Sequence, residues 1–223
     1  MKKIKTGIII VALVISGAII GKYASQASTF NERENINVSG SDKWSDASKK
    51  AIEHMKKMYG EPAEQTESMM IWNKTGPWKK TIVYAREVRH DFPMPHMDVI
   101  EQFIDYKVPV DKFDDLAQYD GSIVCNRTKG EISARCDKEG ANILAINLAN
   151  DVIMGDKDVK SARDFYAKTI TEFMKGGKPS YMAKFQFMPA MGNTADPDEM
   201  SPLIDKQEMM KMKKEKGGAS NPE

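Results

Sequence analysis

The stretch His90-Asp91-Phe92-Pro93-Met94-Pro95-His96-Met97-Asp98 joins two predicted strands. Its conformation decides how these two strands are arranged in the sheet, and thereby the fold. Residues 78–88 before it and 97–108 after it alternate β-branched and aromatic side chains, a pattern typical of strands. Pro93 and Pro95 fix their own φ angles and push the residues before them into extended backbone. The sequence therefore predicts a stiff connector between two strands of one sheet.

Further strands are expected on both sides of this pair. Residues 69–72 form a first hairpin with 78–88, and residues 123–127 and 131–136 form a second one across a short Gly-containing turn. Residues 180–187 carry aromatic side chains at alternate positions and read as a last strand. We therefore expect an antiparallel sheet of five to six strands that includes two hairpins.

Apolar residues that recur every three or four positions predict three to four helices. Packed against the antiparallel sheet, they give an α+β fold with a single domain over residues 42–188. The expected helices cover residues 42–59, 110–119, 137–155 and 158–176, with Asp137 and Asp158 as the N-caps of the last two.

Residues 1–27 have the layout of a signal peptide. Lysines at the start precede an apolar run over residues 7–21, and Ser25-Gln26-Ala27 offers a cleavage site. The alternative is an N-terminal membrane anchor, but this run spans only about 22 Å as a helix, short of the roughly 30 Å hydrocarbon core. We expect an exported protein, in the periplasm or at the outer face of the inner membrane, that touches the membrane only through an uncleaved leader.

The remaining segments and the charge narrow the class of partner. Residues 28–41 are polar and read as a flexible arm, and residues 189–223 read as a Met- and Lys-rich, mostly disordered tail. The formal charge is +1 for the whole chain and −3 for residues 28–223, because four lysines and no acidic residue lie in the leader. This near-neutral balance argues against nucleic-acid binding, and a protein partner in the cell envelope is expected instead.

The connector concentrates side chains that can bind metal ions. Imidazole suits zinc and copper, and thioethers select Cu(I), so we take His90, His96, Met94 and Met97 as candidate ligands. Adjacent residues on an extended segment point to opposite faces, so His96 and Met97 would not converge there. In the structural alternative, the two histidines bond to carboxylates or carbonyls and the segment serves as a docking strip for a partner.

An enzymatic interpretation starts from the same residues. His90 beside Asp91, or His96 beside Asp98, would give an oriented imidazole for the acid–base chemistry of a small hydrolase. No residue stands out as a nucleophile, and the Walker, G-x-S-x-G and H-E-x-x-H motifs are absent from the sequence. A non-enzymatic role is therefore favoured, with no cofactor other than copper or zinc.

The two cysteines, Cys125 and Cys136, lie on the two strands of the second predicted hairpin. A two-residue turn would place Cys125 opposite Ala134, whereas a longer loop could bring the cysteines together. A disulfide there would add about 3 kcal/mol in the loop-entropy model. The alternative is two buried thiols that fill one face of the sheet.

The same hairpin carries a second polar cluster. Its charges alternate in sign, so an ion-pair network is favoured over an anion site. The alternative is that one of the arginines binds the carboxylate group of a ligand. The members of this cluster are Arg127, Glu131, Arg135 and Asp137.

Several motifs together resemble a family of exported bacterial proteins to which no activity is assigned. The resemblance covers residues 42–190 and implies one exported unit, without a mechanism. The motifs are Tyr59-Gly60-Glu61-Pro62, Gly76-Pro77-Trp78-Lys79, His90-Asp91-Phe92-Pro93-Met94-Pro95-His96, Asp120-Gly121-Ser122 and Ala134-Arg135-Cys136-Asp137.

These observations favour a non-enzymatic binding or accessory subunit that docks onto a bacterial envelope complex through its sheet edge and tail. A periplasmic copper- or zinc-binding protein is the first alternative, and a small hydrolase with a His/Asp site is the second.

Overall fold

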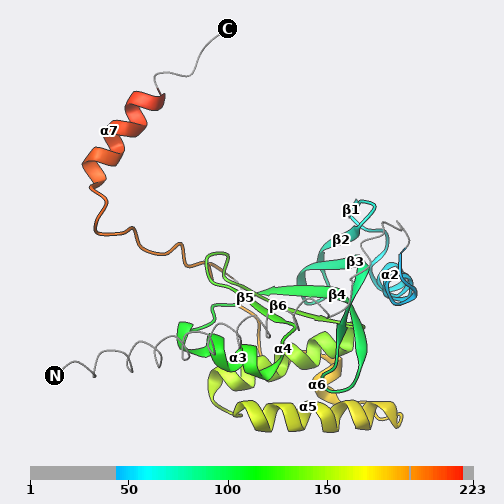
Figure 1. The fold of residues 1–223 in the computed structure, drawn as a ribbon. Coiled ribbons are helices and arrows are strands. Elements are labelled where there is room, and N and C mark those ends of the chain that lie inside the picture. The colour runs from blue at the N-terminus through cyan, green and yellow to red at the C-terminus, as the bar shows by residue number, and fades with distance from the viewer. Residues whose placement is uncertain (1–43, 191, 218–223) are drawn as a thin grey trace, which may run out of the picture. The chain divides into compact units, whose positions relative to one another are not determined.

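The computed structural model describes residues 44–190 and 192–217. The predicted leader and the arm over residues 28–41 lie outside the described residues, and the boundary between the two units of the chain falls between Ser41 and Asp42. The described part forms an antiparallel six-stranded sheet with helices packed against it, which confirms the α+β fold (Figure 1). None of its helices combines the length and the apolar character needed to cross a membrane.

The sheet has the strand order β1-β2-β3-β4-β6-β5, so the long hairpin of β3 and β4 lies at its centre. Both predicted hairpins are present, and a third is formed across the connector. The strands are β1 (Glu64–Gln65), β2 (Met69–Thr75), β3 (Trp78–His90), β4 (His96–Asp105), β5 (Ile123–Asn126) and β6 (Glu131–Cys136).

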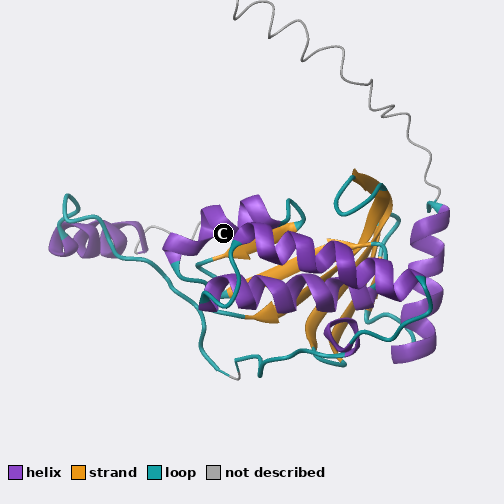
Figure 2. Ribbon diagram, turned by 90° about the horizontal axis from the view of Figure 1, so that it is seen from below, coloured by secondary structure: helices purple, strands orange, loops and turns teal. Residues whose placement is uncertain are grey.

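The helices between residues 46 and 183 cover one side of the sheet and divide the core into two clusters (Figure 2). One cluster joins α2 to β2, β3 and β4, and the other joins β4, β5 and β6 to α3, α4 and α5. The helices are α2 (Asp46–Tyr59), the 3-10 turn η1 (Val110–Lys112), α3 (Phe113–Tyr119), α4 (Glu139–Met154), α5 (Val159–Met174), α6 (Ser180–Ala183) and α7 (Lys206–Gly217).

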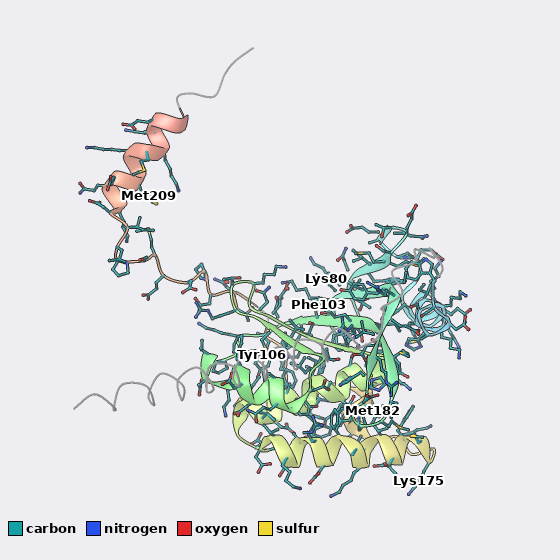
Figure 3. All side chains as sticks on the ribbon, viewed as in Figure 1. Lys80, Phe103, Tyr106, Lys175, Met182 and Met209 are labelled. Atoms are coloured by element: carbon teal, nitrogen blue, oxygen red, sulfur yellow. The ribbon has the colours of Figure 1, made fainter. Side chains whose placement is uncertain are left out.

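The opposite face of the sheet is more polar and partly exposed. Side chains alternate along each strand, so Glu101 and Phe103 of β4 point away from the buried Ile100 and Ile104. Lys80 lies over the Phe103 ring, with its Nζ 4.0 Å from the ring centroid. Figure 3 shows this pair on the side of the sheet away from α4 and α5.

A partly buried carboxylate in the first turn of α4 joins the two halves of the fold. Glu139 Oε1 accepts hydrogen bonds from Tyr59 Oη of α2 at 2.8 Å and from Trp78 Nε1 of β3 at 2.6 Å. Gln102 Nε2 of β4 lies 3.4 Å from the same oxygen, and His54 Nε2 lies 3.4 Å from Oε2. One side chain thus links α2, the sheet and α4.

The predicted strand over residues 180–187 is wrong. Ser180–Ala183 forms the short helix α6, and an irregular segment follows. The Asn147 side chain of α4 holds this segment: its Nδ2 donates to the carbonyls of Tyr181 and Lys184, and its Oδ1 accepts from the Gln186 N–H. These bonds satisfy backbone groups that a strand would pair with a sheet, and β1 provides the sixth strand instead.

The N-cap predictions for α4 and α5 have different outcomes. Asp158 caps α5, since its Oδ1 accepts from the Ser161 N–H at 2.6 Å. Asp137 does not cap α4. The N-cap is Lys138, without a side-chain bond, and Asp137 instead pairs with the Lys138 ammonium at 2.8 Å.

The register of the second hairpin does not support a disulfide. Asn126 pairs with Glu131, so the turn contains four residues, and Cys125 lies opposite Ile132. Cys136 is farther along β6 and lies opposite Ile100 of β4. Both cysteines are free thiols, which contradicts the possible disulfide; of the two thiols in the alternative, Cys136 is buried and Cys125 is half-buried.

The chain beyond residue 188 continues along the second hairpin. Thr194 is buried, and its Oγ1 donates to the Gly130 carbonyl at 2.7 Å. Arg127 pairs with Asp196 and Asp198 in the same segment. Part of the predicted tail is therefore held against the domain, and α7 follows it.

Candidate functional site

Two histidines face each other where the central hairpin closes. His90 ends β3 and His96 begins β4, and the two are cross-strand partners with ring centroids 5.0 Å apart. The connector between them contains a cis Phe92-Pro93 peptide bond. Phe92 packs against Tyr166 of α5, with ring centroids 5.1 Å apart, so the end of the hairpin rests on that helix (Figure 1).

A buried carboxylate lies between the two imidazoles. Asp98 is 1% exposed and lies on the face of β4 that the helices cover. His96 Nε2 is 3.1 Å from Asp98 Oδ1, and His90 Nδ1 is 3.5 Å from Asp98 Oδ2. One donor atom from each of these residues can be chosen so that all three lie within 4.8 Å of one another. The set has two nitrogens and one oxygen, which suits zinc or copper.

A second layer of side chains holds this group. Ser122 Oγ donates to Asp98 Oδ2 at 2.5 Å, and the Ser122 N–H donates to Asp120 Oδ1 at 2.8 Å. Asp120 Oδ1 also lies 3.6 Å from His90 Nε2, so His90 is placed between two carboxylates. On β6, Arg135 Nε lies 3.8 Å from Asp98 Oδ2. These contacts fix the orientation of Asp98 and His90.

The carboxylates of the site respond to burial in different ways. Burial alone would raise the pKa of Asp98, but the adjacent imidazoles of His90 and His96 and the Ser122 hydroxyl outweigh it, and the pKa falls to about 2. For Asp120, burial prevails and raises the pKa above its usual value. Asp98 is therefore ionised at neutral pH.

A hydrogen bond to the backbone fixes the tautomer of His96. In the neutral ring, the nitrogen without a proton is the one that faces Asp98. His96 Nδ1 lies 2.8 Å from the Met94 carbonyl oxygen, and a carbonyl can only accept, so Nδ1 carries a proton. In the neutral ring, Nε2 would then direct a lone pair at the Asp98 carboxylate. The contact is favourable only when a cation, either a second proton or a metal ion, lies at Nε2.

Two further observations indicate that a positive charge between His96 and Asp98 is favourable: the pKa of His96 and the surroundings of Asp98 Oδ1. Interaction with Asp98, followed by that with Cys136, raises the His96 pKa to about 11. Asp98 Oδ1 is buried and has no hydrogen-bond partner of good geometry in the part of the chain that the structure describes. His96 Nε2 and Asp98 Oδ1 are close together but form no well-aligned hydrogen bond. This is the arrangement of two ligand atoms that are directed at one ion.

Cys136 and a cleft complete the site. Cys136 Sγ lies 3.4 Å from His96 Nε2, and both residues line a cleft of about 240 Å³ between the connector and α5. Lys175, labelled in Figure 3, marks the end of α5 on this side. Burial raises the pKa of the Cys136 thiol, so the free thiol stays protonated at neutral pH.

The geometry does not suit a Cys-His-Asp nucleophile. In that arrangement, one imidazole nitrogen contacts the nucleophile and the other contacts the carboxylate. Here Nε2 of His96 faces both Cys136 and Asp98, while Nδ1 is bonded to the Met94 carbonyl. The hydrolase alternative therefore gains no support from this group.

The structure brings together only some of the predicted metal ligands. His90 and His96 converge, and Met94 lies on the cleft beside His96. Met97 is a cross-strand partner of Arg89, is 38% exposed and points to the other face of β4, as the strand alternation predicts.

Sequence reasoning missed Asp120 and Ser122 as site residues, and it considered Cys136 as half of a possible disulfide or as a buried thiol. Asp98 appeared only as a neighbour of His96. The pattern that could have placed Asp98 is its even spacing from the apolar Ile100 and Ile104 on the same strand.

The second polar cluster is not one network, and that prediction is wrong. Each member pairs with a different part of the chain, because β6 lies between β5 and β4 in the sheet and the segment after residue 188 runs along the hairpin. Arg127 pairs with Asp196 and Asp198, Glu131 with Lys79, Arg135 with Asp98, and Asp137 with Lys138.

Comparisons with protein-family models, curated proteins and solved structures found no match for this chain.

Proposed function

We propose that this protein binds a divalent transition-metal ion, zinc or copper(II), through His90, His96 and Asp98. The observation that carries the proposal is the buried contact between His96 Nε2 and Asp98 Oδ1, which requires a cation at the nitrogen. The function is metal binding in the cell envelope, with export as expected from the leader.

The distances support a metal ion without large movements of the ligands. Tetrahedral zinc with bonds of about 2.0–2.1 Å separates its ligand atoms by about 3.3 Å. The separations of Asp98 oxygens from His96 Nε2 and His90 Nδ1 are 3.1 and 3.5 Å. His96 approaches Oδ1 and His90 approaches Oδ2, and one ligand atom from each of the three residues lies within 4.8 Å of the others, so a small side-chain rotation would bring them to one ion.

The surrounding groups are those that orient metal ligands. With Nδ1 directed at the ion, His90 has its Nε2 near Asp120 Oδ1 at 3.6 Å, and His96 has its Nδ1 bonded to the Met94 carbonyl. Metal-bound histidines commonly donate their other N–H to a carboxylate or carbonyl, which fixes the tautomer and the ring orientation. Ser122 does the same for the carboxylate by holding Asp98 Oδ2.

The competing explanation is an ion-pair network closed by protons. In that case Asp98 would hold two imidazolium groups, and the site would only stabilise the end of the hairpin. The two explanations differ in one measurable respect: a proton network has no affinity for zinc beyond that of any surface histidine.

Zinc titration of the full-length chain, purified without a histidine tag and freed of metal by a chelator, tests the proposal. We expect one equivalent of Zn²⁺ to bind, and His96→Ala to weaken binding at least about tenfold because a direct ligand is lost. His54→Ala is the matched control, since His54 bonds to Glu139 and lies outside the site. Equal zinc affinity in all three proteins would refute the metal site.

Docking of the protein onto an envelope complex through the sheet edge and the C-terminal segment stays a prediction.

A further inference from the structure

The cleft beside His96 is lined by three sulfur-containing side chains. Met94 belongs to the connector, Cys136 to the end of β6 and Met174 to the end of α5, and all three line the same 240 Å³ space together with His96. These residues come from separate parts of the sequence and meet only in the folded domain.

The rest of the cleft lining is apolar, with one oppositely charged pair. Asp137 is paired with Lys138, at 2.8 Å, so its charge is compensated. The other lining residues are Pro93, Pro95, Ala141, Tyr166, Ile170 and Phe173. A space of this kind offers soft ligands and few oxygen donors, a combination that favours Cu(I) over Zn²⁺, Mg²⁺ or Ca²⁺.

We propose that this cleft binds a cuprous ion, with Cys136, His96 and Met94 as ligands and Met174 at the entrance. The inference rests on the proposed metal function only in that both use His96. Both sets use His96 Nε2, so that nitrogen binds one ion at a time, and the cleft gives it a softer alternative to the His90, His96 and Asp98 group with copper(I) as the ion.

The distance between the two innermost ligands is suitable. Bonds of about 2.3 Å to sulfur and about 2.0 Å to nitrogen give a sulfur–nitrogen separation of about 3.5 Å at a tetrahedral angle. Cys136 Sγ and His96 Nε2 are 3.4 Å apart. An ion between them would need no rotation of either side chain out of the cleft.

Binding involves no electron transfer. The ion enters as Cu(I), the Cys136 thiol loses its proton to solvent as the sulfur–copper bond forms, and any proton on His96 Nε2 leaves in the same way. The bond to Met94 uses a thioether lone pair and releases nothing. Two protons at most are therefore exchanged for one copper ion.

Packing is the alternative explanation of the three sulfur atoms, because methionine commonly fills irregular gaps. Leucine fills similar gaps but has no donor atom. Replacing methionine by leucine therefore separates metal binding from packing at a small cost in stability.

Competition between the full-length chain and a chromophoric Cu(I) chelator, under anaerobic reducing conditions, measures the affinity. We expect Cys136→Ser and the double variant Met94→Leu/Met174→Leu each to weaken Cu(I) binding at least about tenfold. Met97→Leu is the matched control, since Met97 is adjacent to His96 in sequence but points away from the cleft. It should bind Cu(I) like the unmodified chain.

Zinc titration of the same proteins separates the two proposals. The double methionine variant should keep its Zn²⁺ affinity within about twofold, because neither methionine belongs to the zinc set. Cu(I) affinity that is unchanged in Cys136→Ser and in the double variant, or lost equally in Met97→Leu, overturns the copper inference and leaves the zinc proposal intact. Sulfur-dependent Cu(I) binding without zinc binding would overturn the zinc proposal and leave the copper inference intact.

Discussion

Glu139 Oε1 accepts the Trp78 Nε1–H at 2.6 Å, so a carboxylate at the start of α4 anchors the indole that begins β3. Trp78 is 1% exposed, and its indole N–H depends on Glu139 as acceptor. Tyr59 of α2 donates to the same oxygen. This arrangement makes Glu139 the connection between two helices and the sheet.

Glu139→Ala should lower the free energy of unfolding by about 3 kcal/mol, because it leaves the buried Trp78 N–H and the Tyr59 hydroxyl without an acceptor. Chemical denaturation followed by Trp fluorescence measures the change. Glu67→Ala, which removes an exposed carboxylate, is the control and should change stability by less than about 0.5 kcal/mol. A similar small effect for Glu139→Ala would contradict the anchoring role.

The ion pair of Asp98 and His96 makes the stability of the metal-free protein depend on pH in both the acid and the alkaline range. The Asp98 pKa is lowered from 3.8 to about 2, so its contribution is present above pH 4 and is lost as pH falls toward 2. It amounts to about 2 kcal/mol. The His96 pKa is raised from 6.5 to about 11, so its contribution is complete below pH 6.5 and is lost as pH rises toward 11.

Denaturation curves from pH 2 to pH 11 on the chelator-treated protein check this prediction. Asp98→Asn should flatten both limbs of the profile, since each depends on the carboxylate. Asp91→Asn, which alters an exposed carboxylate in the same connector, should leave both limbs in place. Profiles of identical shape for Asp98→Asn and the unmodified chain would rule out the coupling.

Gly130→Ala should release the segment that follows residue 188. A Cβ atom at this position would lie 2.2 Å from the backbone carbon of Thr194, and the φ angle of +64° is unfavourable for alanine. We expect a loss of at least about 1 kcal/mol in stability and faster proteolytic cleavage near residue 194. Gly121→Ala is the control, because a Cβ there meets nothing within 4 Å.

Cys125 and Cys136 should react slowly with iodoacetamide in the folded protein and rapidly after unfolding. Burial raises the pKa of the Cys125 thiol to about 11 and raises that of Cys136 as well, so little thiolate is present at pH 8. Mass spectrometry under non-reducing denaturing conditions should show two alkylated cysteines. A chain that takes up no label until a reductant is added would indicate a disulfide instead.

The sequence predicted the parts of the fold that depend on local periodicity. Alternation in β3 and β4 and the three- and four-residue spacing in α4 and α5 are properties of short segments, and each identified its element. The segment 180–187 alternates equally well but is held by Asn147, a residue more than thirty positions away. Local pattern carries no information about such a contact.

The candidate site shows a similar division. The connector identified His90 and His96, but their shared carboxylate depends on the pairing of β3 with β4, and the position of Cys136 depends on the register of β6. That register is the pairing of β6 with β4; the pairing of β6 with β5 is separate and contains a four-residue turn, whereas the sequence suggested two residues. The longer turn places Cys125 opposite Ile132 and so separates it from Cys136.

The shortness of β1 bears on self-association. An edge strand with free backbone N–H and C=O groups can pair with the edge of another molecule, and proteins limit this with short or charged edge strands. β1 consists only of Glu64 and Gln65, both exposed, so this edge offers little backbone for pairing and places a negative charge there. This edge of the sheet should therefore resist edge-to-edge aggregation at high protein concentration.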